Sequence, residues 1–332
     1  MWKKVLSVLK IKWVRLSAIF GTLLFLIFYL FFCPNRLPST PAALAPNAED
    51  IHIAVNINDN YAKFLSVAMI SILQNTNEHL HFHILTDGLS PSSVRKIEKL
   101  KKIKPFELDI ITINDDRISQ IPDNKYKLAH FITNYRLLSA SLLPDLDKVI
   151  FLDVDLAFVS DIKDYWRINV ENYYLAAVPD LANMNKKEWI YKLPIPEKAL
   201  YFNSGVMILN LKKWREDNIE NQIFENSIKY GKLLTFPDQD LLNITLIPQV
   251  KYLDMRYNFT TELNYMDAKT KQYLAEKAFL IHWAGALKPW LVPGNLRAEE
   301  FWHYAEYSPF YPEIALVYYT SVAKLLFKSI FG

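Results

Sequence analysis

A short apolar run that ends in two carboxylates constrains the fold more than any other stretch of the chain. Residues 149–152 read Val-Ile-Phe-Leu, and Asp153 and Asp155 follow with one residue between them. The β-branched and aromatic side chains predict a strand, and burial of both its faces predicts an inner parallel strand of an α/β sheet. Because unpaired carboxylates are costly inside a sheet, we expect Asp153 and Asp155 where the strand emerges. Open α/β sheets bind ligands at that edge.

The spacing of the two carboxylates indicates what they bind. Residues two apart in an extended chain project to the same side, so Asp153 and Asp155 can converge. Paired carboxylate oxygens form a hard site suited to Mg²⁺ or Mn²⁺, and a cation held by so few carboxylates usually completes its shell with water and substrate phosphates. The pair therefore predicts a metal–diphosphate site. The alternative is a solvated strand end followed by an acidic turn.

Composition narrows the class of protein. The 332 residues, of which 51% are hydrophobic, suffice for one large α/β domain or two smaller ones. A net charge of +3 is too small to indicate nucleic acid, and we expect no such partner. With 7 glycines, neither a dinucleotide-binding glycine loop nor a Walker loop is present, so a metal and side chains must hold any bound phosphate. The single cysteine, Cys33, excludes an intrachain disulfide and a cysteine-based zinc site.

Three segments precede the globular part. Residues 1–12 are a basic N-terminal segment, and residues 13–33 form an apolar run that predicts a transmembrane anchor. A signal peptide is the alternative, but the run is long for one and no clear cleavage site follows it closely. Residues 34–50 form a proline-rich linker. The anchor predicts a single-pass membrane protein, either in a bacterial inner membrane or in a Golgi-like type II arrangement, with the side of the catalytic domain left open.

Beyond the linker, strand and helix patterns alternate. The expected strands are residues 51–57, 80–86, 106–113, 149–152, 174–178 and 278–281, and the expected helices are residues 62–73, 90–102 and 129–142. This order predicts a mostly parallel, doubly wound sheet flanked by helices. Residues 182–199 are predicted either as a lid over the acceptor or as an ordinary surface loop. Residues 251–259 are expected to form a hairpin arm. The apolar tail 311–331 either lies in a membrane interface or packs on the domain as a terminal helix.

Six short motifs follow one another along the chain. They are Asn58-Asp59-Asn60-Tyr61, Tyr135-Arg136-Leu137, Phe151-Leu152-Asp153-Val154-Asp155, Tyr201-Phe202-Asn203-Ser204-Gly205-Val206, Asp238-Gln239-Asp240, and His282-Trp283-Ala284-Gly285 followed by Lys288-Pro289-Trp290. In this combination the chain resembles glycosyltransferase family 8, and most of all its bacterial lipopolysaccharide galactosyl- and glucosyltransferases. The resemblance implies a glycosyltransferase-A fold, retention of configuration and dependence on a metal. We expect a catalytic domain at residues 51–295 and a C-terminal helical tail at residues 296–332.

The resemblance also implies which residues hold the metal and the diphosphate. Asp153, Asp155 and His282 resemble the metal ligands, and two oxygens with one imidazole suit Mn²⁺ better than Mg²⁺. Gly285 would admit the close approach of a phosphate, and Lys288 would supply a point charge. The alternative for His282 alone is a histidine satisfied at a strand end.

The remaining motif residues resemble those that bind the donor sugar nucleotide. By that resemblance the uridine pocket is Asn58, Asn60 and Tyr61, the sugar or its phosphate meets Arg136, and the hexose hydroxyls meet Asp180, Asn203, Asp238 and Gln239. Asn203 and Gln239 would lie near the anomeric carbon. Asn58 departs from the family pattern, where an aspartate is frequent, so its contact with uracil stays open. A structural Arg–Asp pair is the alternative role for Arg136.

These expectations define an activity. They predict a retaining hexosyltransferase that moves galactose or glucose from a UDP-sugar to a lipopolysaccharide or glycolipid acceptor. Retention requires a covalent intermediate or attack from the leaving-group face. Gln239 is a poor nucleophile, whereas Asp180 and Asp238 are nucleophiles by type; we favour front-face attack. The alternatives are a protein-directed or glycogenin-like transferase and an inactive UDP-sugar-binding scaffold in a membrane complex. Two glycosylation sequons, at Asn243 and Asn258, lie within or beside the motifs, which favours chance over glycan attachment.

Overall fold

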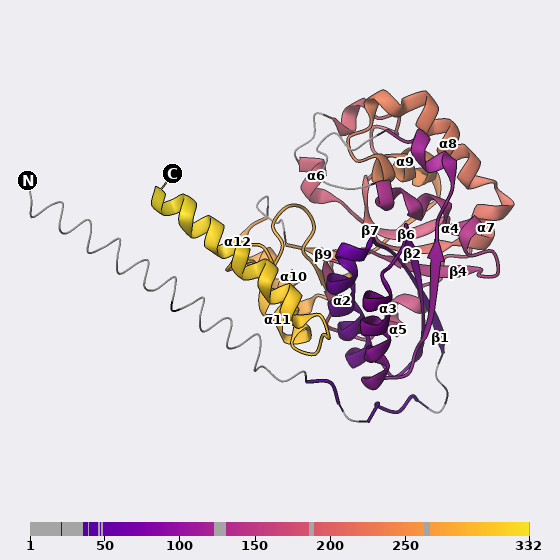
Figure 1. Ribbon diagram of the computed structural model, residues 1–332. Helices are drawn as coiled ribbons and strands as arrows, with labels where there is room; N and C mark the ends of the chain where they lie inside the picture. Colours follow the sequence, from indigo (N-terminus) through magenta and orange to yellow (C-terminus); the bar gives the residue numbers. More distant parts are fainter. Residues whose placement is uncertain are drawn as a thin grey trace, which may run out of the picture.

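The apolar strands assemble into a seven-stranded sheet at the centre of the domain (Figure 1). The computed structural model describes residues 21, 36–38, 40–45, 47, 49–122, 131–185, 189–261 and 266–331. In spatial order the strands are β3 (Glu107–Thr112), β2 (His79–Thr86), β1 (Asp50–Asn56), β4 (Lys148–Leu152), β7 (Phe202–Asn210), β6 (Leu175–Pro179) and β8 (Val250–Tyr252). All neighbours are parallel except β4 with β7 and β6 with β7. The expected mostly parallel sheet is therefore present.

A small second sheet lies beside the carboxyl end of β4. It consists of β5 (Leu156–Phe158), β10 (Leu280–His282) and β9 (Phe259–Thr260), with β10 in the middle. β5 follows β4 after a turn that contains the two predicted carboxylates. Since β10 pairs antiparallel with β5, the end of β10 is brought back to this same turn.

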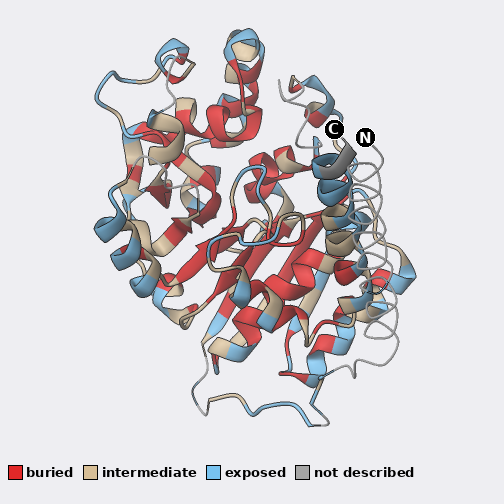
Figure 2. Cartoon of the chain, turned by 90° about the vertical axis from the view of Figure 1, so that its left-hand side faces the viewer, coloured by how far each residue is buried: buried red, intermediate tan, exposed pale blue. Residues whose placement is uncertain are grey.

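Helices cover both faces of the large sheet, so its inner strands are largely buried, whereas the edge strand β3 is mostly exposed (Figure 2). The α-helices are α2 (Ala62–Asn75), α3 (Pro91–Glu98), α4 (Ser139–Leu142), α5 (Lys163–Trp166), α6 (Leu181–Asn185), α7 (Leu211–Glu216), α8 (Ile219–Tyr230), α9 (Pro237–Leu246), α10 (Ala268–Lys277), α11 (Ala298–Ala305) and α12 (Tyr311–Phe331). On β4, Ile150 and Leu152 join the core on one face, while Val149 and Phe151 join the core on the other. β4 is thus an inner strand, as its apolar run predicted, but it is parallel only to β1 and antiparallel to β7.

Local signals explain where several helices begin. The Ser90 hydroxyl accepts a hydrogen bond from the Ser93 backbone N–H at 3.2 Å, and Pro91 occupies the first turn of α3, as the sequence predicted. The helix expected at residues 129–142 is different: the described part is a 3₁₀ helix, η4 (Phe131–Leu138), followed by α4. This tighter turn carries Arg136 into the interior, where its side chain is 2% exposed.

The hairpin arm expected at residues 251–259 is wrong. β8 pairs parallel with β6 in the large sheet, whereas β9 pairs parallel with β10 in the small one. Between them lies a 3₁₀ turn, η8 (Met255–Asn258). The segment therefore crosses from one sheet to the other, because each short strand finds its hydrogen-bond partners on a different neighbour.

The transmembrane anchor expected at residues 13–33 is withdrawn, together with the membrane localisation deduced from it. Apart from Gly21, these residues lie outside the part of the chain that the structure describes. Among the described residues, no helix has both the length and the apolar character needed to cross a bilayer. The longest of them, α12, has 21 residues but carries Glu313, Lys324 and Lys328.

The C-terminal helices pack on the face of the sheet that α2 covers. Phe301 of α11 and Ile314 of α12 are at most 1% exposed and belong to the same core as β1. In Figure 1 the two helices lie beside α2, and the far end of α12 projects away from the domain. Its apolar side chains there, including Leu325 and Phe327, are exposed.

Candidate active site

The ends of two strands bring the three predicted metal ligands together. β4 ends at Leu152, so Asp153 and Asp155 emerge from the large sheet in the turn that leads to β5. His282 is the last residue of β10 and pairs with Leu156 of β5, directly after the second carboxylate. One donor atom from each of the three side chains lies within 4.8 Å of the others.

The His282 ring is oriented as a metal ligand would be. Its Nδ1 lies 2.9 Å from Asn258 Oδ1, which can accept the proton on that nitrogen and leave the lone pair on Nε2. Nε2 is buried and has no hydrogen-bond partner in the described part of the chain. It faces Asp155 Oδ1 at 3.2 Å and Asp153 Oδ2 at 3.7 Å. A lone pair opposed to two carboxylates is unfavourable unless a cation lies between them, so the donor set fits Mn²⁺ or Mg²⁺.

Gly205 provides the space in which these groups meet. β7 lies beside β4, and the Asp153 N–H donates to the Gly205 carbonyl at 2.7 Å. A Cβ at Gly205 would overlap both the Asp153 carboxylate and the His282 ring. The Asn203-Ser204-Gly205 motif therefore needs its glycine because the backbone of β7 forms one wall of the ligand cluster.

Lys288 approaches the cluster from the loop after β10. It forms an ion pair with Asp155 and donates a hydrogen bond to the Trp283 carbonyl at 2.8 Å. Burial would raise the pKa of Asp155, but its interaction with the Lys288 ammonium lowers it, and the net shift is to well below the usual range. Asp155 is therefore ionised throughout the neutral range. Gly285, in the same loop as Lys288, has a φ of 81°, which glycine adopts without strain.

The buried guanidinium of Arg136 balances the negative charge of the other carboxylate, Asp153. The guanidinium donates to Asp153 Oδ1 at 2.5 Å and to the Ser204 carbonyl at 2.6 Å, and its Nε lies 3.3 Å from Asp238 Oδ2. Burial lowers the pKa of Arg136, but Asp153 and Asp238 outweigh burial and raise it. These contacts are those of a structural Arg–Asp pair, the alternative that the sequence left open.

The residues expected to bind the hexose hydroxyls form a second, largely buried cluster, which consists of Asp180, Asn203, Asp238 and Gln239. Gln239 Nε2 donates to Asp180 Oδ2 at 3.0 Å, and Gln239 Oε1 accepts from the Ser204 N–H at 2.9 Å. Asn203 Nδ2 lies 3.4 Å from Asp180 Oδ2, and Asn203 Oδ1 accepts from Asn258 Nδ2 at 2.9 Å. These bonds fix the orientation of the Gln239 amide and connect this cluster to the metal ligands.

The residues expected at the uridine lie in the turn after β1. Asn58 precedes the 3₁₀ helix η1 (Asp59–Tyr61), and its Oδ1 is buried with no partner among the described residues. Asn60 and Tyr61 are exposed. The Tyr61 ring meets Phe64 edge-on at 5.7 Å, and Phe64 stacks on Trp290 at 3.9 Å. This aromatic contact holds the turn after β1 next to the loop that carries Lys288.

The sequence analysis missed the role of Asn258. It is 1% exposed and contacts both His282 and Asn203, so it joins the two clusters. In the sequence it stands 24 residues before His282 and attracts notice only as a sequon. Asn243, the other sequon asparagine, is 0% exposed and binds the Phe202 backbone, so neither side chain is open to a glycan in the folded domain.

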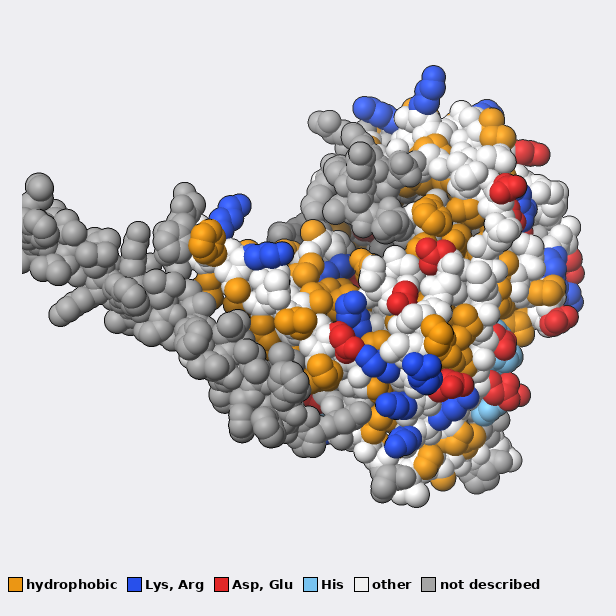
Figure 3. Space-filling model, in the orientation of Figure 1, with side chains coloured by type: hydrophobic (Ala, Val, Ile, Leu, Met, Phe, Trp, Pro, Cys, Tyr) orange, Lys and Arg blue, Asp and Glu red, His pale blue; other side chains and the backbone are white. Residues whose placement is uncertain are grey.

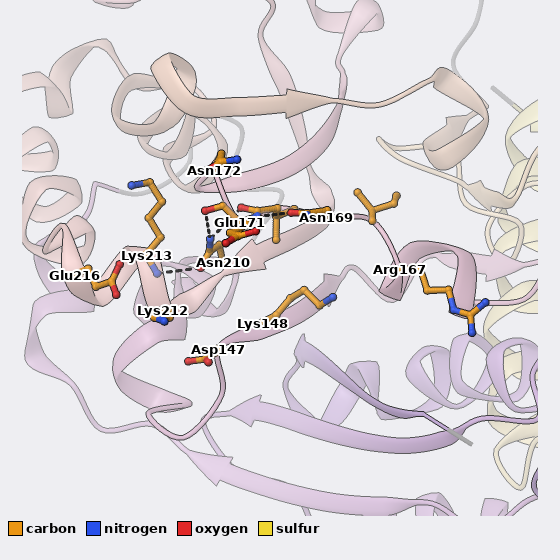
Figure 4. A pocket seen from close by; sticks show the side chains of 12 residues that line it. Asp147, Lys148, Arg167, Asn169, Glu171, Asn172, Asn210, Lys212, Lys213 and Glu216 are labelled. Carbon is orange, nitrogen blue, oxygen red and sulfur yellow. Dashed lines mark hydrogen bonds between the residues drawn. The ribbon is translucent and has the colours of Figure 1, made fainter. Parts of the chain in front are cut away.

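A cavity of about 640 Å³ lies at the opposite edge of the sheet (Figure 4). Its lining includes Lys148, where β4 begins, and Asn210, where β7 ends. The predicted site residues are instead found past the end of β4 and near the start of β7. None of them lines this cavity, which is therefore distinct from the candidate active site.

An α/β transferase with a candidate metal site is the class of protein that this arrangement indicates, and comparison with known proteins identifies the family. Residues 52–293 match the model of glycosyl transferase family 8, so the chain belongs to that family. The lipopolysaccharide 1,2-glucosyltransferase of Escherichia coli K12 is 29% identical over 252 residues, 73% of each chain. The lipopolysaccharide 1,3-galactosyltransferase of Salmonella typhimurium is 28% identical over 255 residues, 74% of each.

Solved structures agree with this assignment. The galactosyltransferase LgtC, solved in complex with donor and acceptor sugar analogs, is similar with a TM-score of 0.68 and 26% identity over 79% of this chain and 96% of that one. The family expected from the motifs is thereby confirmed, and the likeness supports the glycosyltransferase-A fold.

Replacing Asn258 should weaken cation binding. Asn258→Ala removes the acceptor that orients His282, and loss of such a partner typically costs about 10–100-fold in metal affinity. Free Mn²⁺ measured by electron paramagnetic resonance reports this affinity without any substrate. Asn258→Asp keeps an acceptor oxygen and should retain more of the affinity than Asn258→Ala. Equal affinities for the wild type and Asn258→Ala would show that the ring needs no partner.

Asp240 should make stability depend on pH. It accepts hydrogen bonds from the Tyr201 hydroxyl at 2.6 Å and from the Thr235 and Phe236 N–H groups, yet burial raises its pKa from 3.8 to about 6. Because the folded pKa is the higher one, the native state binds more protons between these values. The stabilisation from this group is therefore complete below about pH 4 and is lost as the pH rises through about 6.

Asp240→Asn provides the comparison. The free energy of unfolding of the wild type minus that of the variant should fall by roughly 3 kcal/mol between about pH 4 and pH 7. Urea denaturation at several pH values measures this difference, in which other titrating groups cancel. A difference that stays constant over the interval would contradict the raised pKa.

Proposed function

We propose that this chain is a retaining hexosyltransferase that transfers galactose or glucose from a UDP-sugar to a lipopolysaccharide or glycolipid acceptor, with Mn²⁺ or Mg²⁺ as cofactor. The observation that carries the proposal is the unpartnered Nε2 of His282, which faces Asp153 and Asp155 beside the Lys288 ammonium. That arrangement suits a cation together with a diphosphate. The named activities of the lipopolysaccharide relatives support the hexose and the acceptor class.

The leaving group would be stabilised by the cluster around Asp155. Asp153, Asp155 and His282 would hold the cation, which when bound supplies positive charge to the diphosphate. Lys288 is the second positive group there, and its contact with Asp155 keeps it at the point where charge develops on the departing UDP. Lys288 therefore has a role in the transition state as well as in binding.

The donor hexose would lie against the cluster of Asp180, Asn203, Asp238 and Gln239. Asp180, Asp238 and Gln239 are buried residues, each 7–8% exposed, and a site of buried polar groups rejects sugars that leave those groups unpaired. Ser204 and Asp180 fix the orientation of the Gln239 amide, which leaves one N–H of Nε2 for a sugar hydroxyl. These contacts make the cluster the candidate determinant of which hexose is accepted.

Retention is best accounted for by attack from the leaving-group face. Asp180 Oδ2 accepts from Asn183 and Gln239, and Asp238 faces Arg136, so neither carboxylate is a free nucleophile. The acceptor oxygen would form its bond to the anomeric carbon as the bond to UDP breaks and its electron pair leaves on the phosphate. A phosphate oxygen of UDP would take the proton of the acceptor hydroxyl.

A donor screen tests the activity. The purified chain should release UDP from UDP-galactose or UDP-glucose when Mn²⁺ is present and not when a chelator is, with less release from UDP-N-acetylglucosamine and UDP-xylose. Lys288→Ala should lower kcat by about 100-fold or more, because it removes charge stabilisation at the leaving group. Binding of UDP without release from any donor, with and without a lipopolysaccharide acceptor, would favour the inactive scaffold instead.

A search for a covalent sugar tests the mechanism. Intact-mass spectrometry of the wild type, Asp180→Ala and Asp238→Ala, each incubated with a 2-fluoro donor analogue, should find no glycosyl adduct. Double displacement would accumulate such an adduct when its turnover is slowed. An adduct on Asp180 in the Asp238→Ala protein, or on Asp238 in the Asp180→Ala protein, would overturn front-face attack.

A further inference from the structure

A second cluster of metal-ligating side chains lies outside the active site. It consists of His52 on β1 and of His81 and His83 on β2, and one ring nitrogen from each lies within 4.8 Å of the others. The two strands are parallel neighbours, with His52 opposite His81 and Ala54 opposite His83. All three rings therefore project from one face of the sheet, and the small side chain of Ala54 leaves them room.

Carboxylates from β3 complete the surroundings of the three rings. Glu107 pairs with His81 and Asp109 pairs with His83 along the sheet. Asp109 Oδ2 lies 2.8 Å from His81 Nε2 and 3.1 Å from His83 Nδ1, and Glu107 Oε2 lies 3.2 Å from His81 Nδ1. Figure 3 shows histidine side chains beside acidic ones at the surface of the molecule. The negative charge of this cluster favours a cation.

The rings themselves are spaced as ligands of one ion. His52 Nδ1 lies 3.0 Å from His83 Nε2. A Zn–N bond of about 2.0–2.1 Å places two tetrahedral ligands roughly 3.3–3.4 Å apart, so a small adjustment admits an ion. The rings of His81 and His83 lie 4.2 Å apart and those of His52 and His81 lie 5.3 Å apart, which keeps the third imidazole within reach.

His83 is the member that hydrogen bonds leave unsatisfied. The residue is 4% exposed, yet its Nδ1 has no hydrogen-bond partner among the described residues, although Asp109 is near. Burial and the neighbouring rings of His81 and His52 lower the pKa of His83 to about 4, so the imidazole is neutral near pH 7. Neutral imidazole is the form that binds metal ions. The other ring nitrogen, Nε2, lies 3.0 Å from His52 Nδ1 and is the atom positioned to share an ion with that ring.

We propose that His52, His81 and His83 bind one Zn²⁺ ion at a site separate from the active site, with Asp109 as the carboxylate that orients the His83 ring from its Nδ1 side. Imidazole ligands favour Zn²⁺ over Mg²⁺ and Ca²⁺. Three imidazoles leave the fourth position of a tetrahedral ion to water, and the ion would tie β1 to β2. The assignment does not depend on the transferase activity.

Zinc binding by the metal-stripped full chain tests the site. Asp155→Asn serves as the background, because it weakens the active-site cluster. Competition with a chromophoric chelator and isothermal titration should show one Zn²⁺ bound per chain, and Co²⁺ in its place should show the visible absorption of a tetrahedral ion. Adding His52→Ala and His81→Ala should weaken Zn²⁺ binding by more than about 100-fold, since loss of an outer partner alone costs about 10–100-fold.

His79→Ala is the matched control. His79 lies on the same strand, contacts Asp50 and Glu107, and is not one of the three clustered rings, so its removal should leave Zn²⁺ affinity unchanged. Zn²⁺ should raise the Tm of the background and of His79→Ala, but not that of the double-histidine variant, whose fold is checked by circular dichroism. Unchanged zinc affinity in the double variant, or no zinc bound by the background, would overturn the proposal.

Discussion

The charges of Asp153 and Asp155 have to be balanced at the edge of the large sheet, where their side chains are only 31% and 14% exposed, and two separate parts of the domain supply the balancing charge. Arg136 reaches Asp153 from η4, and Lys288 reaches Asp155 from the loop after β10. Breaking a buried pair by removing one partner typically costs about 3–5 kcal/mol, because the other charge is left unpaired. The positions of η4 and of the loop after β10 are therefore tied to the two carboxylates, although each lies far from them in the chain.

The same balance keeps the site ready for a substrate. Arg136 is fully engaged with protein groups, whereas Lys288 and His282 lie on the side of Asp155 where a ligand would bind. Asn258 connects this side to Asn203 and hence to the cluster around Gln239. Asn258 would transmit a shift of the His282 ring to Asn203 and the cluster around Gln239. We therefore expect the cation and the donor sugar to influence each other's binding.

Local patterns predicted the parts of this arrangement that local forces determine. The apolar run before Asp153 was sufficient to predict an inner strand, since buried carboxylates must emerge at its end, and Ser90 with Pro91 was sufficient to predict the start of α3. The direction of β7 was not predictable, because an apolar strand reads the same in a parallel and in an antiparallel pair. The hairpin expected at residues 251–259 failed for a related reason: the partners of β8 and β9 are distant strands.

The two histidine-containing clusters show how strand geometry decides which chemistry a sheet can support. His282 is the last residue of its strand and faces two carboxylates that lie in a turn between strands. His52, His81 and His83 lie within their strands, beside residues of neighbouring strands, and only His83 is buried. The alternation His79-Leu80-His81-Phe82-His83 is visible in the sequence, but the pairing of His52 with His81 depends on register. An ion held by residues within strands would stabilise the sheet, whereas one held at a strand end can also meet a ligand.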